Sequence, residues 1–364
     1  MPPPMRIIIT GLLLCAVLTA CHQVESPATS TVTLLTPTPA DTSTPTHTPP
    51  PTVTPTSLPP TLTSMPAPTH TRTPLPTLSG SGGGVIAYCF TPPSGRMQIN
   101  LINADGSGDR ALINYHLGVN HLDWSPDGQT IAAVAYMDSS FTTWSIYVFN
   151  ADGSNPLRLT NTIGAADSEP AWSPDGARIL FTRIEFTTSY HFRSDLWLMN
   201  ADGSERHLVV TDGFAGKWSP DGTRLIYTHN KTGNYEIYTS NIDGTDERRL
   251  TDTSADESYP SWSPDGTQIA FSVSTGEWNA PESANTFEIF VMNSDGTGMR
   301  QLTDNTATDV YSRWSPDGSL LAFGSDRAES GHFDIYVMDA DGLFIWQVTH
   351  TPSGARAINP VWLP

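Results

Sequence analysis

Cysteine and basic residues are both scarce in this sequence of 364 residues, which carries 18 Lys and Arg against 37 Asp and Glu. The resulting net charge of −19 argues against nucleic-acid binding, which depends on Lys and Arg that neutralise phosphates. It argues equally against electrostatic docking to anionic lipids. Of the three cysteines, Cys15 and Cys21 lie near the N-terminus, so Cys89 is left in the remaining sequence without a partner for an intrachain disulfide.

Long apolar runs are also missing, since the N-terminal run Ile7–Leu18 is shorter than the roughly 20 residues that span a bilayer. It follows Arg6 and ends in Leu18-Thr19-Ala20-Cys21, which predicts a signal peptide over residues 1–20. The last four residues resemble a bacterial lipobox, and the resemblance implies cleavage before Cys21 and lipidation of that cysteine. The acyl chains would then anchor the protein to a membrane outside the cytoplasm. The alternative is an ordinary secretory signal that leaves Cys21 free.

Aromatic residues are absent between Ser26 and Leu78, where the chain consists mostly of Thr, Pro, Ser and Ala. Such a segment has too little apolar surface to fold, and its prolines favour an extended polyproline II conformation. We therefore predict that residues 21–84 form a disordered stalk that begins at the lipidated cysteine. At about 3.1 Å per residue it would reach on the order of 150 Å. The composition also suits O-glycosylation, but we expect a passive spacer.

One motif, Trp-Ser-Pro-Asp-Gly, is abundant. Its five copies begin at Trp124, Trp172, Trp218, Trp262 and Trp314, and a sixth tryptophan follows at Trp362. Successive tryptophans lie 44 to 52 residues apart, and a period of this length built from short strands is typical of a β-propeller. Because Trp and Asp recur at fixed positions of the repeat, we expect the tryptophans to pack between blades and the aspartates to form turns.

When the unit that begins at Val85 is counted as the first, the fifth repeat, which contains Trp262, shows the four strands of one blade most clearly. Tyr259–Trp262 is the first strand, and Ser263–Gly266 is a tight turn in which Pro, Asp and Gly favour the required backbone angles. Gln268–Ser272 alternates as a second strand, Glu288–Asn293 is the third, and Arg300–Thr303 is the fourth. Four antiparallel strands make one blade of a propeller.

The two ends of the repeat region complement each other. Residues Val85 to Leu112 supply strands two to four without a Trp-Ser-Pro-Asp-Gly strand, whereas Ile358 to Pro364 supplies only that strand. Third strands are expected around Ile99, Ile146, Leu196, Ile237 and Ile335, with Asp-Gly turns at Asp105, Asp152, Asp202, Asp243 and Asp341. We therefore predict an all-β, six-bladed propeller over residues 85–364, closed by pairing of the C-terminal strand with the N-terminal blade.

The sixth repeat resembles the TolB-type propeller repeat, which also occurs in tricorn-like and prolyl-oligopeptidase-family propellers. The resemblance rests on Trp314-Ser-Pro-Asp-Gly318, Leu321-Ala-Phe323, Ser325-Asp-Arg327 and Ile335-Tyr-Val-Met338. It implies the fold of residues 85–364 and leaves the function to residues outside the repeat. The peptidases of this group carry an α/β-hydrolase domain, and this sequence has no G-x-S-x-G nucleophile motif. We therefore expect no enzymatic activity.

A first candidate site is the channel mouth of the ring. Equivalent positions of a ring point toward one axis, and the residues three before each tryptophan are His121, Glu169, Ala215, Tyr259, Tyr311 and Asn359. All of these except Ala215 are polar or aromatic and are candidate binding residues. His121 and Glu169 alone are too few ligands for a metal, so we expect neither a metal nor another cofactor.

A second candidate site is the face that carries the variable loops. Its aromatic residues are Trp144, Phe186, Tyr190, Phe192 and Trp278. An aromatic, acidic face of this kind suits a protein loop, a peptide or a glycan, although about half of these rings are expected to pack on neighbouring blades.

These features together favour a non-enzymatic, lipid-anchored interaction module of the cell envelope, present as a monomeric propeller. Its expected partner is an envelope protein or a cell-wall polymer bound through the loop face, with no nucleic acid involved. The main alternative is a glycan-binding or metal-assisted glycan-active propeller that uses the channel mouth. A sensor domain is a third alternative.

Overall fold

The propeller is built from twenty-four β-strands in six antiparallel sheets of four strands each. A computed structural model describes residues 84–114, 118–135, 144–188, 191–275 and 286–364, all within the compact unit Arg72–Pro364. The described residues contain no helix, and so none long and apolar enough to cross a membrane. Cys21 and residues 22–83 of the expected stalk lie outside them.

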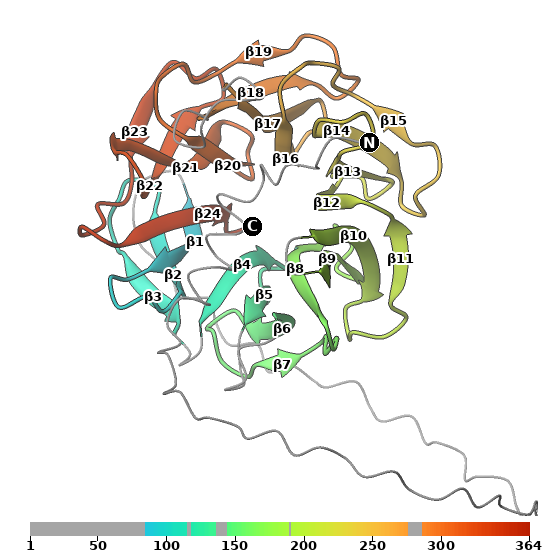
Figure 1. Ribbon diagram of the computed structural model, residues 1–364. Coiled ribbons are helices and arrows are strands. Elements are labelled where there is room, and N and C mark those ends of the chain that lie inside the picture. The colour runs from blue at the N-terminus through green and yellow to red at the C-terminus, as the bar shows by residue number, and fades with distance from the viewer. Residues whose placement is uncertain (1–83, 115–117, 136–143, 189–190, 276–285) are drawn as a thin grey trace, which may run out of the picture. The chain divides into compact units, whose positions relative to one another are not determined.

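The six sheets are the six blades (Figure 1). Blade 1 contains β24 (Arg356–Trp362), β1 (Val85–Thr91), β2 (Gln98–Asn103) and β3 (Arg110–Ile113). Blade 2 contains β4 (Val119–Trp124), β5 (Thr130–Ala135), β6 (Ser145–Asn150) and β7 (Leu157–Arg158). Blade 3 contains β8 (Ala165–Trp172), β9 (Arg178–Thr188), β10 (His191–Asn200) and β11 (His207–Val210).

The remaining blades follow the same order. Blade 4 contains β12 (Gly213–Trp218), β13 (Arg224–His229), β14 (Glu236–Asn241) and β15 (Arg248–Arg249). Blade 5 contains β16 (Glu257–Trp262), β17 (Gln268–Ser274), β18 (Phe287–Asn293) and β19 (Arg300–Gln301). Blade 6 contains β20 (Asp309–Trp314), β21 (Leu320–Glu329), β22 (His332–Asp339) and β23 (Ile345–Gln347).

The ring closes as the sequence predicts. The C-terminal strand β24 pairs antiparallel with β1, so that Trp362 lies opposite Ile86 and Val361 opposite Ala87. Figure 1 shows the last strand beside the first, in the sheet that the N-terminal strands complete. The six-bladed, all-β architecture is therefore confirmed, and the predicted fifth repeat matches β16 to β19 to within two residues at each end.

The Ser-Pro-Asp-Gly turns are fixed by their own side chains. In blade 5 the Ser263 hydroxyl donates to Asp265 at 2.6 Å, and the Thr267 backbone N–H donates to the same carboxylate at 3.0 Å. The Gln268 backbone N–H donates to the Ser263 hydroxyl oxygen at 2.9 Å, which begins the second strand. The same contacts recur in the four other blades that carry the motif, blades 2, 3, 4 and 6, so the repeated aspartates are turn residues as expected.

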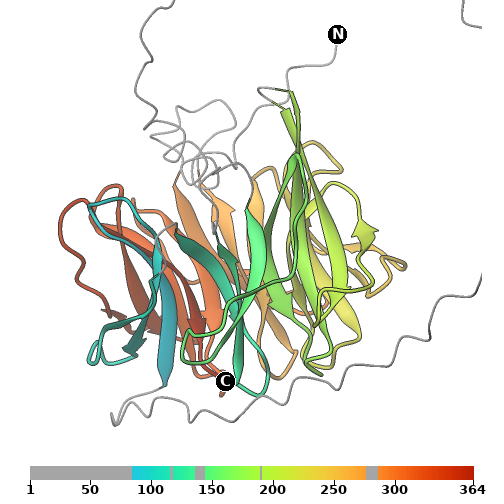
Figure 2. The ribbon, with the colours of Figure 1, turned by 90° about the horizontal axis from the view of Figure 1, so that it is seen from below.

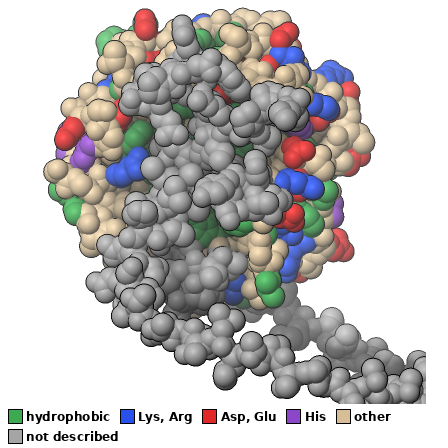
Figure 3. Space-filling model, in the orientation of Figure 1, with side chains coloured by type: hydrophobic (Ala, Val, Ile, Leu, Met, Phe, Trp, Pro, Cys, Tyr) green, Lys and Arg blue, Asp and Glu red, His purple; other side chains and the backbone are tan. Residues whose placement is uncertain are grey.

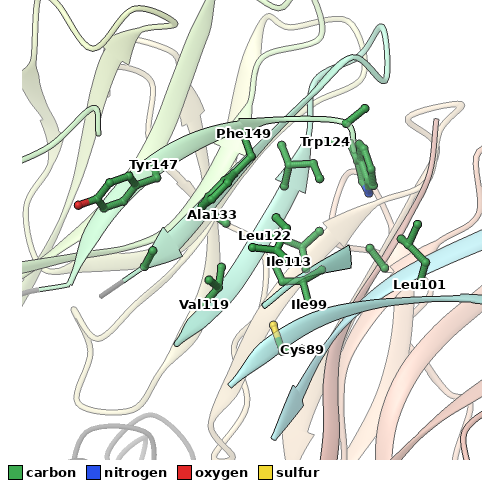
Figure 4. Packing of buried hydrophobic residues seen from close by; sticks show 14 residues of the cluster. Cys89, Ile99, Leu101, Ile113, Val119, Leu122, Trp124, Ala133, Tyr147 and Phe149 are labelled. Carbon is green, nitrogen blue, oxygen red and sulfur yellow. The ribbon is translucent and has the colours of Figure 1, made fainter. Parts of the chain in front are cut away.

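The repeated tryptophans lie between blades. Each of the six interfaces between neighbouring blades holds an apolar cluster with one of them: Trp124, Trp172, Trp218, Trp262, Trp314 and Trp362. Figure 4 shows the cluster between blades 1 and 2, where Trp124 and Leu122 face Ile99 and Cys89. The prediction that these rings build the scaffold is confirmed.

One glycine of the outer turns shows why Asp-Gly is needed there. Gly296, between β18 and β19, has a φ of +88°, a conformation that L side chains rarely adopt. A Cβ added to it would lie 2.7 Å from the Leu250 carbonyl oxygen of the preceding blade. Backbone conformation and contact between blades therefore both exclude a side chain at this position.

Because the strands alternate in direction, the connections divide between two faces of the ring (Figure 2). We call the side with the connections between first and second strands and between third and fourth strands the turn face. The loop face carries the connections between second and third strands and those that lead into the next blade. The long pair β9 and β10 rises above the other strands at the loop face.

Candidate functional site

The first strand of every blade contains a β-bulge three residues before its tryptophan. In blade 5 the register between β16 and β17 shifts between Ser258 and Ser261. The bulged residues all have positive φ, from 37° to 60°: His121, Glu169, Ala215, Tyr259, Tyr311 and Asn359. A bulge of this kind locally bends the strand and re-aims a side chain.

This backbone conformation carries a cost of about 1–2 kcal/mol for each L-residue. Strained residues often mark functional sites, but strain that recurs at the same position of all six blades belongs to the architecture of the propeller. Its effect is to bring together the six side chains predicted from their position before tryptophan. All six line one cavity of about 30 Å³ on the axis of the ring.

Polar contacts order part of this ring. The Glu169 carboxylate accepts hydrogen bonds from the Thr182 hydroxyl at 2.8 Å and from the Ala215 backbone N–H at 2.9 Å, which joins blades 3 and 4. The Tyr259 and Tyr311 rings are in contact, with centroids 4.4 Å apart. Burial lowers the pKa of His121, so its imidazole is neutral at physiological pH.

The cavity is far smaller than the roughly 300–1,000 Å³ of a typical small-molecule site. It has room for about two water molecules or one small ion, since a single water needs about 10–15 Å³. A sugar ring does not fit there. Among the described residues, no group of three or more His, Cys, Asp or Glu side chains is arranged to hold a metal ion.

Cys89 lies in the apolar cluster between blades 1 and 2, beside the His121 backbone and the Asn359 side chain. Its side chain is 1 % exposed, and burial raises the pKa of the thiol to about 12. A thiol in this state is not a nucleophile at neutral pH. Cys89 is therefore a small buried strand residue, as its place in an apolar run predicts.

A second ring of side chains was not predicted. The residues one before each tryptophan also occupy inner positions, and three of them are charged: Asp123 of blade 2, Lys217 of blade 4 and Arg313 of blade 6. Lys217 and Arg313 line the same cavity as the bulged residues. The bulged positions were found by counting three residues back from each tryptophan. Counting one residue back would have found these three charged residues.

The structure separates the aromatic residues proposed for the loop face. Phe186 is 51 % exposed near the end of β9, whereas Trp144, just before β6, is buried at 5 % exposed. Phe192 lies in β10, paired with Phe186 of β9. Tyr190 and Trp278 lie outside the described residues.

Ile163 is an exposed residue of the loop face that sequence reasoning missed. It precedes β8 and is 96 % exposed. Because Ala165 pairs with Glu185, Ile163 and Phe186 lie at the same end of two adjacent strands of blade 3. Figure 3, which views the loop face, shows the described acidic and basic side chains interspersed around its rim.

Residues 183–277 match the model of the TolB β-propeller domain, and residues 110–145 match that of the WD domain, G-β repeat. The Tol-Pal system protein TolB of Anaeromyxobacter dehalogenans is 31 % identical over 32 % of this chain. The crystal structure of TolB from Acinetobacter baumannii superposes with a TM-score of 0.61 and 19 % identity, over 77 % of this chain and 67 % of that one. The propeller is TolB-like.

A second solved structure shows the extent of this likeness. A putative TolB from Agrobacterium tumefaciens gives a TM-score of 0.57 at 20 % identity, over 78 % of this chain and all of that one. Identities at this level show the shared fold alone. The match to the Anaeromyxobacter protein spans 25 % of that relative's length, so the TolB-like propeller corresponds to a part of it.

Proposed function

We propose that the TolB-like propeller is a non-enzymatic interaction module of the cell envelope, anchored outside the cytoplasm through a lipidated Cys21. It binds an envelope protein through the loop face of blade 3. The observation that carries this proposal is the adjacent exposure of Ile163 and Phe186, at 96 % and 51 %. Large apolar side chains that stand together on a polar surface often mark protein interaction sites.

The choice of a protein over a cell-wall polymer rests on two arguments. The channel cavity, at about 30 Å³, does not admit a sugar ring, so a ligand at the mouth has to rest on the surface. One relative is named a Tol-Pal system protein. By analogy of fold, we transfer to this protein the expectation that it works together with other proteins. A cell-wall polymer is the competing outcome of the experiment.

Two matched double variants of the full-length protein test the proposal. Ile163→Ser with Phe186→Ser removes the apolar pair of the loop face, and Leu343→Ser with Phe344→Ser removes an exposed pair between β22 and β23 on the turn face. Crosslinking to purified envelope proteins and co-sedimentation with isolated cell-wall sacculi measure the two classes of partner.

We expect the loop-face variant to lose its protein crosslinks while the turn-face variant keeps them. Equal crosslinking by both variants would contradict the proposed surface. Sedimentation with sacculi that depends on the loop-face pair would replace the protein partner with a polymer.

A further inference from the structure

Three charged side chains of alternate blades interact at the channel, and two of them, Lys217 and Arg313, line its cavity. Asp123 lies in β4, Lys217 in β12 and Arg313 in β20, and each stands one residue before the tryptophan of its strand. The charges of Lys217 and Arg313 both act on Asp123, and Arg313 also acts on Lys217. The cavity itself is lined by two cations, Lys217 and Arg313, and by the Glu169 carboxylate of a bulged position, and Asp123 acts on the two cations from beside it.

Neither cation has an anionic partner in contact. None of the ion pairs among the described residues includes Lys217 or Arg313. The Arg313 Nη1 atom is buried and has no hydrogen-bond partner there. Both residues are partly buried, and a cation in that position without a partner is costly, because the protein does not replace the water it has lost.

The two nearest carboxylates are held by other groups. Asp123 accepts the Trp172 backbone N–H at 2.7 Å, and Glu169 accepts the Thr182 hydroxyl and the Ala215 N–H. They balance the cations at longer range and leave the donor atoms of Lys217 and Arg313 open. Burial, together with the charge of Arg313, lowers the pKa of Lys217 to about 8, as expected for two cations that share one small space.

We propose that Lys217 and Arg313 bind one small monovalent anion, a halide or a formate-sized carboxylate, in the channel of the ring. The cavity of about 30 Å³ suits this size and excludes larger anions such as citrate. A charge-assisted hydrogen bond from each cation would hold the anion. Because the two cations come from blades 4 and 6, the bound anion would also join blades across the axis.

Bromide is the direct probe. Crystals grown in sodium bromide should show an anomalous peak in contact with Lys217 and Arg313. In solution, sodium chloride should raise the melting temperature of the full-length protein more than sodium gluconate does at equal ionic strength. A channel that holds only water in the bromide crystals would overturn the proposal.

Variants separate specific binding from a general salt effect. Lys217→Met should weaken the chloride response about tenfold or more in concentration, as expected when one charge-assisted hydrogen bond is lost. Lys231→Met is the matched control, because Lys231 forms an exposed ion pair with Glu247 on the same blade. Equal chloride responses in the two variants would also overturn the proposal, and Arg313→Gln provides an independent second variant if Lys217→Met does not fold.

Discussion

The indole Nε1 of Trp362 donates a hydrogen bond of 3.0 Å to the backbone carbonyl of Arg313. The donor belongs to the closing strand of blade 1 and the acceptor to the first strand of blade 6, so the bond crosses the junction where the two ends of the ring meet. Trp218 makes the equivalent bond to Ala171 at 3.1 Å. The indole N–H of Trp262, by contrast, is buried without a partner among the described residues.

This difference predicts unequal costs for the same substitution. Trp362→Phe removes ring volume and the bond to Arg313, whereas Trp262→Phe removes ring volume alone. We expect Trp362→Phe to lower the free energy of unfolding by about 1 kcal/mol more than Trp262→Phe. Denaturant unfolding followed by circular dichroism measures both, and equal losses would show that the bond contributes nothing at the closure.

Gly296 gives a second prediction, because a side chain there meets both backbone strain and the Leu250 carbonyl. Gly296→Ala should lower the free energy of unfolding by about 2–4 kcal/mol. Gly233→Ala is the control, since Gly233 also has a positive φ but no atom within 4 Å of an added Cβ. The control should cost about 1–2 kcal/mol. Thermal denaturation compares the two variants. Equal losses of stability would mean that the contact with the Leu250 carbonyl adds nothing to the cost of Gly296→Ala.

Ala215 occupies a bulge with a φ of 53°, where glycine is free of strain. Ala215→Gly should therefore stabilise the protein by about 0.5–1 kcal/mol, after the entropy cost of glycine in the unfolded chain is subtracted. Ala133→Gly in β5, where Ala133 has ordinary strand geometry, should destabilise it by a similar amount. Chemical denaturation distinguishes the two directions, and destabilisation by Ala215→Gly would mean that the bulge is not strained.

Two buried glutamates predict how stability changes above pH 4.5. Burial raises the pKa of Glu257 and of Glu288 from 4.5 to about 7. The folded state therefore keeps two protons that the unfolded chain releases, so the stabilisation is complete below pH 4.5 and is lost as the pH rises through 7. The melting temperature should fall over this range, and Glu257→Gln should flatten the slope. A slope of Glu257→Gln equal to that of the unsubstituted protein would contradict this prediction.

The repeated aspartates predict the opposite slope in acid. Hydrogen bonds from Ser263 and from the Thr267 backbone lower the pKa of Asp265 below 3.8, and the same holds in the neighbouring turns. Their contribution is present above pH 3.8 and is lost as the pH falls through the folded-state values. Melting curves should therefore show greatest stability near pH 4.5. A melting temperature that keeps rising toward pH 2.5 would mean that these turn contacts are not formed.

The scaffold was predictable because it repeats. The spacing of the tryptophans predicts six blades, and the fragment from Ile358 onward predicts the closing strand that pairs with β1. The convergence of the residues three before each tryptophan follows from the same symmetry. Their positive φ does not follow, because Tyr259 and Tyr311 give no local signal for a left-handed backbone.

The parts that differ between blades were harder to predict. Trp144 is buried although it flanks a variable loop, and Ile163 is exposed although it is apolar, because neighbouring blades decide which side chains are covered. Lys217 and Arg313 each precede one copy of the Trp-Ser-Pro-Asp-Gly motif, at a position where the other blades carry different residues, so the repeat gives no signal for a cation there. Sequence periodicity therefore predicts positions well, but it does not predict which positions have been given a function.

The pairing that closes the ring also determines how the protein carries mechanical tension. β1 is hydrogen-bonded to β24 on one side and to β2 on the other, and the chain enters it at Val85. A pull transmitted along the preceding segment acts on a strand held by two ladders at once, whereas an edge strand unzips one bond at a time. A force applied through the N-terminal segment therefore reaches the ring at β1, a strand that is hydrogen-bonded on both sides.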